Sequence, residues 1–278
     1  MLEGGDIVTA KESMVKRKSV RTYKQEPIDI SAIESLQSCI NEISAPFDTK
    51  MRFKILEAKL GDSGKKLGTY GVIKGARNFI CTAVVNEERG EENLGYAMEK
   101  IILHATSLGL GSCWLAGAFD KAGFSKAMEL NSGEVLPIAC PIGYSAEHKS
   151  FIDKALRTIQ GSKNRKDWSE IFFEKDFGRP LTKEAAGRYT DALEMVRIAP
   201  SGFNKQPWRI VKDGDNFHFF MEGKKKDGQY SIDRLCIGIA MCHFEMMLNE
   251  LGMYGKWVDN NPKLANGEGK EYIISFVL

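Results

Sequence analysis

The sequence lacks the features that mark several large classes of protein. Its 39 Lys and Arg residues against 37 Asp and Glu leave a formal net charge of only +2, whereas nucleic-acid-binding proteins carry a strong basic excess or a basic face. Its longest apolar stretches, FICTAVV and GLGLGSCWLAGAF, are far shorter than the roughly 20 residues that span a bilayer. We therefore expect neither a nucleic-acid nor a membrane partner. The amino-terminal segment is acidic rather than basic and apolar, so we expect no secretion signal and a cytoplasmic location.

Patterns of reactive side chains are also missing. The six cysteines form no CxxC pair, and the four histidines never pair at positions i and i+4. We therefore expect reduced thiols and no metal site. No serine lies in a GxSxG nucleophile elbow, so the sequence does not support a serine hydrolase. The segment GDSGKK has two residues between its glycines where a phosphate-binding P-loop needs four, so it is expected to be an ordinary loop.

The positive features begin with an ordinary globular composition, 43% hydrophobic over 278 residues. Apolar residues at helical spacing predict helices over 30–43 and 94–108. Alternation predicts a half-buried strand over 51–57, and a continuous apolar run predicts a buried strand over 79–85. This mixture of helices and strands is sufficient for a substantial core.

The chain contains two related segments. GYAMEKIILHATSLGLGSCWL begins at Gly95, and GIAMCHFEMMLNELGMYGKWV begins 143 positions later at Gly238. Six identities share this register: Gly95/Gly238, Ala97/Ala240, Met98/Met241, Leu108/Leu251, Gly109/Gly252 and Trp114/Trp257. Each segment follows an Ala-Pro corner, Ala45-Pro46 in the first half and Ala199-Pro200 in the second, and the flanking elements have the same order. We interpret this as an internal duplication with halves at 1–165 and 166–278, packed as the two subunits of a dimer would be.

Each half has a distinctive segment that the other lacks. The first half has RKSVRTY at 17–23, in which Arg17, Ser19 and Arg21 alternate and could direct several donors at one phosphate. The second half has APSGFNKQPWR at 199–209, where Pro200 and Pro207 stiffen the chain. This complementarity predicts one composite site between the halves.

Four segments together resemble the FMN-dependent nitroreductase family: RKSVRTY, APSGFNKQPWR, GLGSCWLAGAF at 109–119 and PIGY at 141–144. The position of the proline corner in the second half resembles the single-chain branch, where one polypeptide supplies both halves of a pseudo-dimer. The resemblance implies an α+β chain with a three-layer α/β/α nitroreductase-like fold, built from two degenerate repeats. The chain would then be a monomer or a homodimer.

The resemblance also implies residue roles. Arg17, Lys18 and Ser19 would bind the FMN phosphate and ribityl chain, and Arg21 would face the N1/C2 edge of the ring. Ala116 and Gly117 would lie beside flavin N5. The remaining cofactor-binding residues would be a second phosphate clamp and the proline corner: Lys163, Arg165, Pro200, Ser201, Gly202, Asn204 and Gln206. No protein side chain is expected to act as an obligatory acid or base.

The implied activity is an NADH- or NADPH-dependent FMN oxidoreductase that passes electrons to a small-molecule acceptor, such as a nitroaromatic or a quinone, by a ping-pong mechanism. Relatives often have an asparagine near the position of Thr69 and Tyr70, and this chain does not. A flavin-binding module without efficient turnover is therefore an alternative. A nucleic-acid-binding protein that uses KRKSVR as a basic arm is another, and it would purify without flavin.

Overall fold

The computed structural model describes residues 8–58, 68–146, 164–223 and 230–278. Its first part contains α1 (Ala10–Lys16), α2 (Ile30–Asn41), β1 (Met51–Glu57), β2 (Asn78–Val85), α3 (Gly90–Ser107), β3 (Gly111–Ser112), α4 (Lys121–Met128), β4 (Glu134–Val135) and β5 (Ala139–Gly143). Its second part contains α6 (Trp168–Ile171), β6 (Phe172–Glu174), α7 (Lys183–Ala186), the 3-10 turn η1 (Gly187–Tyr189), α8 (Thr190–Ile198), the 3-10 turn η2 (Gly202–Asn204), β7 (Trp208–Asp213), β8 (Asn216–Glu222), α9 (Ile232–Glu250), β9 (Lys256–Val258) and β10 (Lys270–Val277).

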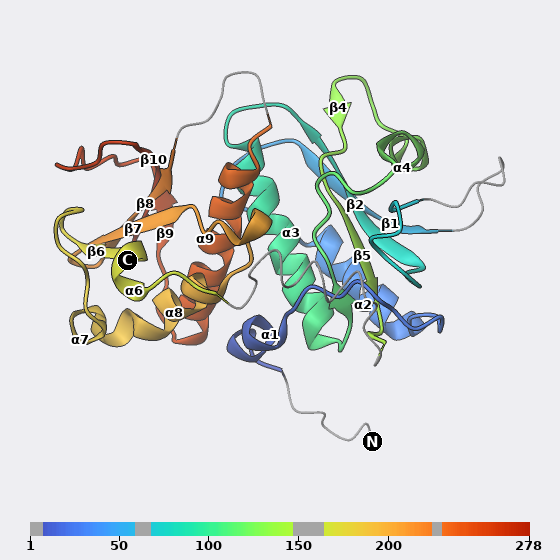
Figure 1. Cartoon of the computed structure of the whole chain (residues 1–278), viewed down its shortest axis with the longest axis horizontal. Helices are drawn as coiled ribbons and strands as arrows, with labels where there is room; N and C mark the ends of the chain where they lie inside the picture. The colour runs from blue at the N-terminus through green and yellow to red at the C-terminus, as the bar shows by residue number, and fades with distance from the viewer. Residues whose placement is uncertain (1–7, 59–67, 147–163, 224–229) are drawn as a thin grey trace.

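The strands form two sheets with the same internal order (Figure 1). The first sheet runs β1-β2-β5-β3, with β4 also paired to β2, and the second contains β7-β8-β10-β9. Every neighbouring pair in these two series is antiparallel. The repeated topology confirms the predicted duplication. The second sheet has one further strand, β6, which pairs in parallel with β7.

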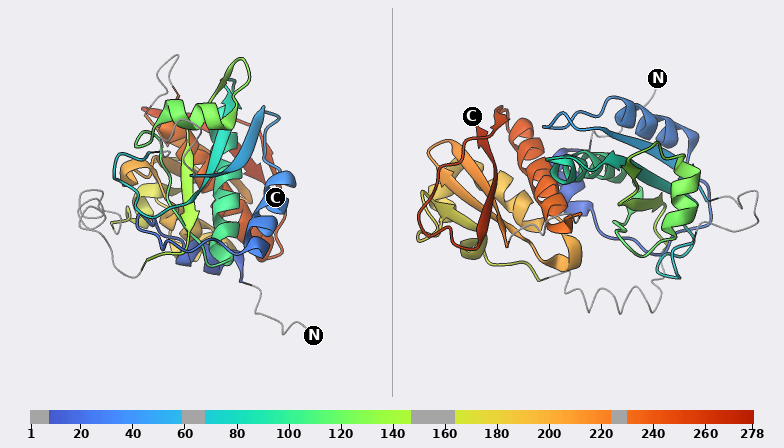
Figure 2. Two further views of the ribbon diagram at one scale, coloured as in Figure 1. Left: turned by 90° about the vertical axis from the view of Figure 1, so that its right-hand side faces the viewer. Right: turned by 90° about the horizontal axis from the view of Figure 1, so that it is seen from above.

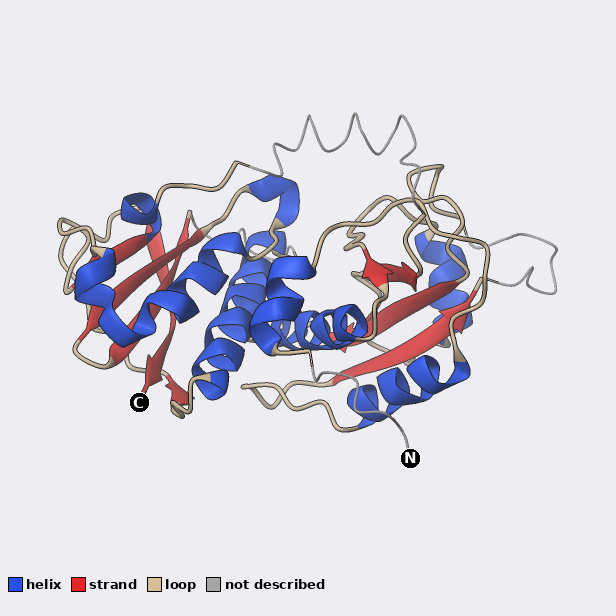
Figure 3. Ribbon diagram, turned by 90° about the horizontal axis from the view of Figure 1, so that it is seen from below, coloured by secondary structure: helices blue, strands red, loops and turns tan. Residues whose placement is uncertain are grey.

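Helices occupy the middle of the molecule, and a sheet lies on each side of them (Figure 3). The largest core cluster contains residues from α3, α9 and one face of each sheet. Seen from above, α3 and α9 run through the centre of the molecule, between the two sheets (Figure 2). The chain thus folds as two related layered halves joined by their helices, as two subunits would be.

The alternation of β2 explains the three layers of the first half. Ile80 and Val84 face the central helices, whereas Phe79 and Cys81 face a second core cluster. Phe124 of α4 belongs to that second cluster and contacts the Phe79 ring edge to face, with centroids 5.0 Å apart. Successive side chains of a strand point to opposite faces, so β2 can be buried on both sides and separate two helical layers.

The outer face of the second sheet has a different cover. Phe173, Val211 and Phe220 form a small cluster there, and Phe177 and Tyr272 pack against it. The Phe177 ring contacts both Phe173 and Phe220 edge to face. Among the described residues of this half, aromatic side chains from loops and an adjacent strand therefore take the place that α4 has in the first half.

Two of the duplicated glycines lie where α3 crosses α9. A Cβ added to Gly95 would lie 2.0 Å from the carbonyl oxygen of Leu235, and one added to Gly238 would lie 1.9 Å from that of Glu92. These contacts are reciprocal, because Leu235 follows Glu92 by the same 143 positions that separate the two glycines. The glycines allow the backbones of the two helices to touch, and the internal symmetry passes through this crossing.

The predicted elements are present with shifted ends. The helix predicted over 94–108 begins at Gly90, because its first turn is polar but buried: Glu91 and Asn93 are at most 2% exposed. An apolar period does not detect such a turn. All six cysteines are free, as expected, and five of them are buried. No helix of the described ranges is long and apolar enough to cross a membrane.

Candidate functional site

The basic run lies against the end of the first sheet. α1 begins with a capping box made by Thr9 and Glu12, and Arg17 follows its last residue. Ser19 then forms a parallel bridge with Ser112 of β3, and the amide of Val20 donates to the Ser112 carbonyl at 2.8 Å. The run therefore lies beside the segment that leads to Ala116 and Gly117.

The segment 115–117 after β3 is fixed to the first sheet through Leu115. Leu115 exchanges two backbone hydrogen bonds with Ala139, at 3.0 and 3.1 Å. Ala116 is half-buried and Gly117 is exposed, and a Cβ added to Gly117 would meet no atom within 4 Å. The backbone at Gly117 is therefore open to a planar ligand, while its neighbours are fixed by the sheet.

The proline corner follows α8 and is tightly folded. Phe203, Asn204 and Gln206 all have positive φ, at 50°, 55° and 50°, which is uncommon for residues other than glycine. The Ser201 hydroxyl accepts from the Gln206 amide at 2.9 Å. The Cys236 thiol of α9 accepts from the Gly202 amide at 3.2 Å. These bonds hold the corner in a conformation that costs backbone energy.

The amide side chains of the corner hold the segment 164–166. Asn204 donates to the carbonyl of Asn164 at 2.6 Å, and its side-chain oxygen accepts from Arg165 Nη1 at 2.8 Å. Gln206 accepts from the Lys166 amide at 2.8 Å and donates to the Asn164 carbonyl at 3.3 Å. Arg165 also donates to the carbonyl of Ala199 at 3.0 Å. The corner of the second half thus places the guanidinium of Arg165.

Three guanidinium groups gather at this point. Burial, and then the nearby charges of Arg17 and Arg197, lower the pKa of Arg165 to about 10. Arg197 is paired with Glu194. The Arg17 side chain is only 7% exposed, and its Nη1 is buried with no hydrogen-bond partner within the part of the chain that the structure describes. A cluster of partly buried cations with an unused donor has the chemistry to bind an anionic group such as a phosphate.

The corresponding corner of the first half is closed. Asn93 of α3 accepts from the Phe47 amide at 2.9 Å and donates to its carbonyl at 2.7 Å. The Arg89 guanidinium lies 5.7 Å from the centre of the Phe47 ring. Arg89 also donates to the Ile273 carbonyl and pairs with Asp259 at 3.1 Å. The side chains of Arg89 and Asn93 therefore pack against this corner and cover it.

The other residues singled out in the sequence differ in their exposure to solvent. Lys18 is exposed and Arg21 is only 6% exposed. Lys163 lies outside the described residues. Thr69 is buried, and its hydroxyl donates to the Ile73 carbonyl at 3.3 Å. Tyr70 is 72% exposed with a φ of 48°.

Sequence reasoning missed the support that α3 and α9 give to the site. Cys236 anchors the corner, and Glu99 lies 3.8 Å from Arg17 Nε. Arg197 completes the cationic cluster around Arg165. Glu99 lies outside the apolar face of the predicted helix, so its burial had no signal in the sequence, and its partners come from distant parts of the chain.

Comparison with known proteins identifies the family of this chain. The family described as "Putative TM nitroreductase" matches residues 9–248. The chain belongs to this nitroreductase family. Among curated proteins, no sequence matches it.

One solved structure has the same fold over the whole chain, and others align with about half of it. A "putative nitroreductase" from Thermotoga maritima aligns with a TM-score of 0.66 at 16% identity, over 100% of this chain and 97% of that one. A nitroreductase with bound FMN from Bacteroides fragilis aligns with a TM-score of 0.41 at 16% identity, over 53% of this chain and 92% of its own. A "Putative NADH dehydrogenase/NAD(P)H nitroreductase" from Bacteroides thetaiotaomicron aligns with a TM-score of 0.42 at 24% identity, over 51% and 89%.

Proposed function

We propose that this member of the nitroreductase family is an FMN-dependent oxidoreductase with a single composite flavin site between its halves, 1–165 and 166–278. The observation that carries the proposal is the cationic cluster at the meeting point of the two distinctive segments. Arg17 comes from the first half and has an unused buried donor. Arg165 is held by the corner of the second half and has a lowered pKa. Both features fit a phosphate as the missing partner.

Arg17, Ser19 and Arg165 would hold the phosphate of FMN, with Lys18 at the exposed rim. Lys163 would add a further charge. Ser19 supplies a hydroxyl next to β3, and Arg165 is held in place by the corner of the second half. A bidentate guanidinium is well suited to phosphate oxygens. The lowered pKa of Arg165 also favours this assignment, because a dianion would offset the repulsion from Arg17 and Arg197.

The ring would lie between the Ala116–Gly117 segment and the proline corner. Small residues permit a close approach of the backbone to the ring, and no atom occupies the Cβ direction of Gly117. Pro200, Ser201 and Gly202 would form the wall on the other side. The Gly202 amide is already used by Cys236, so this glycine would act through its small size. Asn204 and Gln206 would act by bracing the wall and Arg165.

Bound FMN supplies the redox chemistry, since its ring accepts a hydride and returns electrons to a second substrate. The chain's own residues would bind, orient and charge-stabilise it. Arg21 would place a positive charge at the pyrimidine edge, which favours the reduced, anionic ring. We propose NADH or NADPH as the donor and a nitroaromatic, a quinone or a similar small molecule as the acceptor. The exposed side chains of Tyr70 and Phe203 would border the acceptor pocket.

The first experiment is a spectroscopic one. Purified protein is incubated with FMN, the excess is removed, and NADH or NADPH is added without oxygen. We expect a retained flavin spectrum that bleaches with at least one donor. Retention without bleaching would instead support a flavin-binding module, and no retained flavin would contradict the composite site.

In Arg21→Ala, a lower FMN affinity or a more negative flavin potential is expected. An unchanged affinity and an unchanged potential would show that Arg21 is not part of the site.

A further inference from the structure

Glu99 lies at the centre of the helical layer with its carboxylate completely buried. It is 0% exposed. One oxygen accepts from the indole nitrogen of Trp114 at 2.9 Å. The other lies 3.0 Å from His243 Nε2 and 3.8 Å from Arg17 Nε. A carboxylate is expensive to bury, so it persists in such a place only when several donors or charges surround it.

The three partners of Glu99 connect it to different parts of the proposed flavin site. Arg17 begins the basic run. Trp114 lies two residues before Ala116, on the segment proposed to face the ring. His243 Nδ1 lies 3.0 Å from the carbonyl of Met195, in the helix that ends at the proline corner. One buried carboxylate therefore connects the three parts that the site requires.

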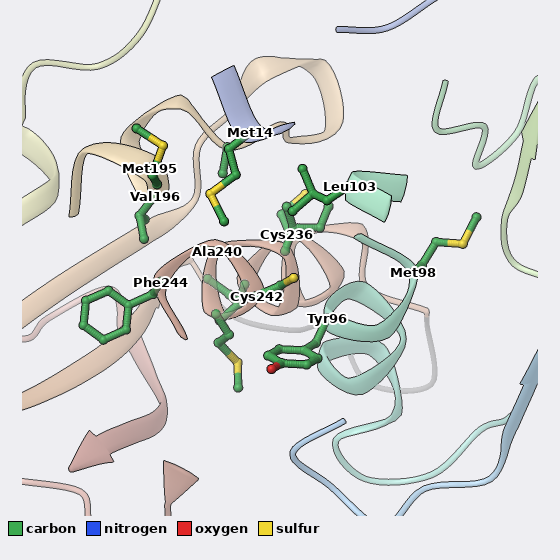
Figure 4. Packing of buried hydrophobic residues seen from close by; sticks show 14 of the residues in the cluster. Met14, Tyr96, Met98, Leu103, Met195, Val196, Cys236, Ala240, Cys242 and Phe244 are labelled. Atoms are coloured by element: carbon green, nitrogen blue, oxygen red, sulfur yellow. The ribbon is translucent and has the colours of Figure 1, made fainter. Parts of the chain in front are cut away.

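Comparison of the two halves shows that only the first half has a buried carboxylate at the position of Glu99. The position equivalent to Glu99 in α9, 143 residues later, is Cys242. Cys242 lies in the packed contact between the two central helices, where it lies near Tyr96 (Figure 4). The half that keeps the basic run therefore has the carboxylate, and the half without such a run has a small apolar residue.

We propose that Glu99 is a positioning residue for the flavin phosphate: it fixes the Arg17 guanidinium so that the unused Nη1 points toward the anion. This inference rests on the proposed function. Arg17 has no other ion pair among the described residues, and its Nη1 is buried without a partner. Glu99 thus holds Nε on one side of the guanidinium and leaves the other side for the phosphate.

The variant Glu99→Gln separates this role from a structural one. The glutamine carbonyl can still accept from Trp114. Its amide can donate to His243 Nε2 when the ring proton lies on Nδ1, toward the Met195 carbonyl. The same amide would present hydrogens to Arg17, which is itself only a donor. The substitution is therefore expected to keep the packing and release Arg17 alone.

A matched control exists in the other half. Trp257, the counterpart of Trp114, donates to Glu245 at 2.6 Å, and Tyr96 donates to the same oxygen at 2.8 Å. Glu245→Gln therefore removes a half-buried carboxylate that also binds a tryptophan but contacts none of the residues proposed to bind the flavin. It should leave flavin affinity unchanged.

The experiment compares the dissociation constants of FMN and riboflavin, which differ by the phosphate, in the wild type, Glu99→Gln, Glu245→Gln, Arg17→Ala and the double variant Arg17→Ala/Glu99→Gln. For Glu99→Gln we expect FMN binding to weaken roughly tenfold, the loss typical of one charge-assisted contact. Riboflavin binding should stay within about twofold by the same reasoning, since that contact is absent from riboflavin. In the Arg17→Ala background, Glu99→Gln should add no further loss of FMN affinity.

Three outcomes would overturn the inference: equal losses for FMN and riboflavin, an unchanged FMN affinity, or a selective gain in FMN affinity, which would make Glu99 a competitor of the phosphate. A wild type that binds neither flavin would overturn the proposed function itself. A melting temperature close to that of the wild type verifies that Glu99→Gln is folded. If it melts much lower, Arg17→Lys provides the second test: it should lower the FMN-to-riboflavin affinity ratio, and an unchanged ratio would overturn the inference.

Discussion

At the residue scale, Arg165 carries its positive charge in an unfavourable place. Burial and two neighbouring guanidiniums lower its pKa below the ordinary arginine value, to about 10. Because the folded-state pKa is lower than the unfolded one, the charge costs stability below pH 10. This cost disappears as the pH rises from about 10 toward the ordinary arginine pKa. A bound phosphate would reverse the balance, since it favours the charged form.

The pH dependence of binding follows from this shift. When the pH is raised from 8 to 10.5, the free protein loses the Arg165 proton, so the FMN-to-riboflavin affinity ratio should fall. Riboflavin is the control because it shares the ionisation of the ring but has no phosphate. Fluorescence titration at each pH measures the ratio. A ratio that stays constant up to pH 10.5 would contradict this prediction.

At the element scale, the crossing of α3 and α9 determines how the two halves meet. The Cβ that Gly95→Ala introduces would lie 2.0 Å from a backbone carbonyl oxygen of the other helix. The helices must move apart, which we expect to cost about 1–3 kcal/mol of unfolding free energy. Gly90→Ala, in the same helix, is the control, because its Cβ would have an ordinary contact at 3.6 Å. Denaturant unfolding measures both, and a Gly95→Ala variant as stable as Gly90→Ala would contradict the described crossing.

The predictability of the elements depends on how local their causes are. The apolar period of α3 and the alternation of β1 lie within a few residues, so the sequence predicts these elements and their duplication. The polar first turn of α3 is buried by contacts with α9 and the first-half corner, so its start was missed. The same applies to Glu99 and His243, which meet across 144 positions. Sequence alone offers no period or spacing for such a contact.

The candidate site shows the same limit. The resemblance singled out Asn204 and Gln206 as cofactor-binding residues, but their side chains hold 164–166 and thereby place Arg165. The two prolines of the corner predict a stiff chain, and in the structure hydrogen bonds to Ser201 and Cys236 hold this corner in place. Which donors remain for a ligand depends on the path of a distant segment of the chain. Composition cannot specify that path.

At the scale of the whole molecule, the two halves keep one topology but differ at their corners. The corner at 199–207 meets the cationic cluster, whereas Arg89 and Asn93 close the corner near Phe47. Internal symmetry would allow two flavin sites, as in a dimer of identical subunits. The difference between the corners predicts one flavin for each chain, in a monomer or in each subunit of a homodimer.

A crystal structure of the protein with FMN tests this account most directly. We expect one FMN per chain, with its phosphate between Arg17 and Arg165 and its ring between Gly117 and the proline corner. The corner near Phe47 should remain covered by Arg89. An FMN bound at the Phe47 corner, two FMN molecules per chain, or a phosphate remote from both Arg17 and Arg165 would contradict the composite site.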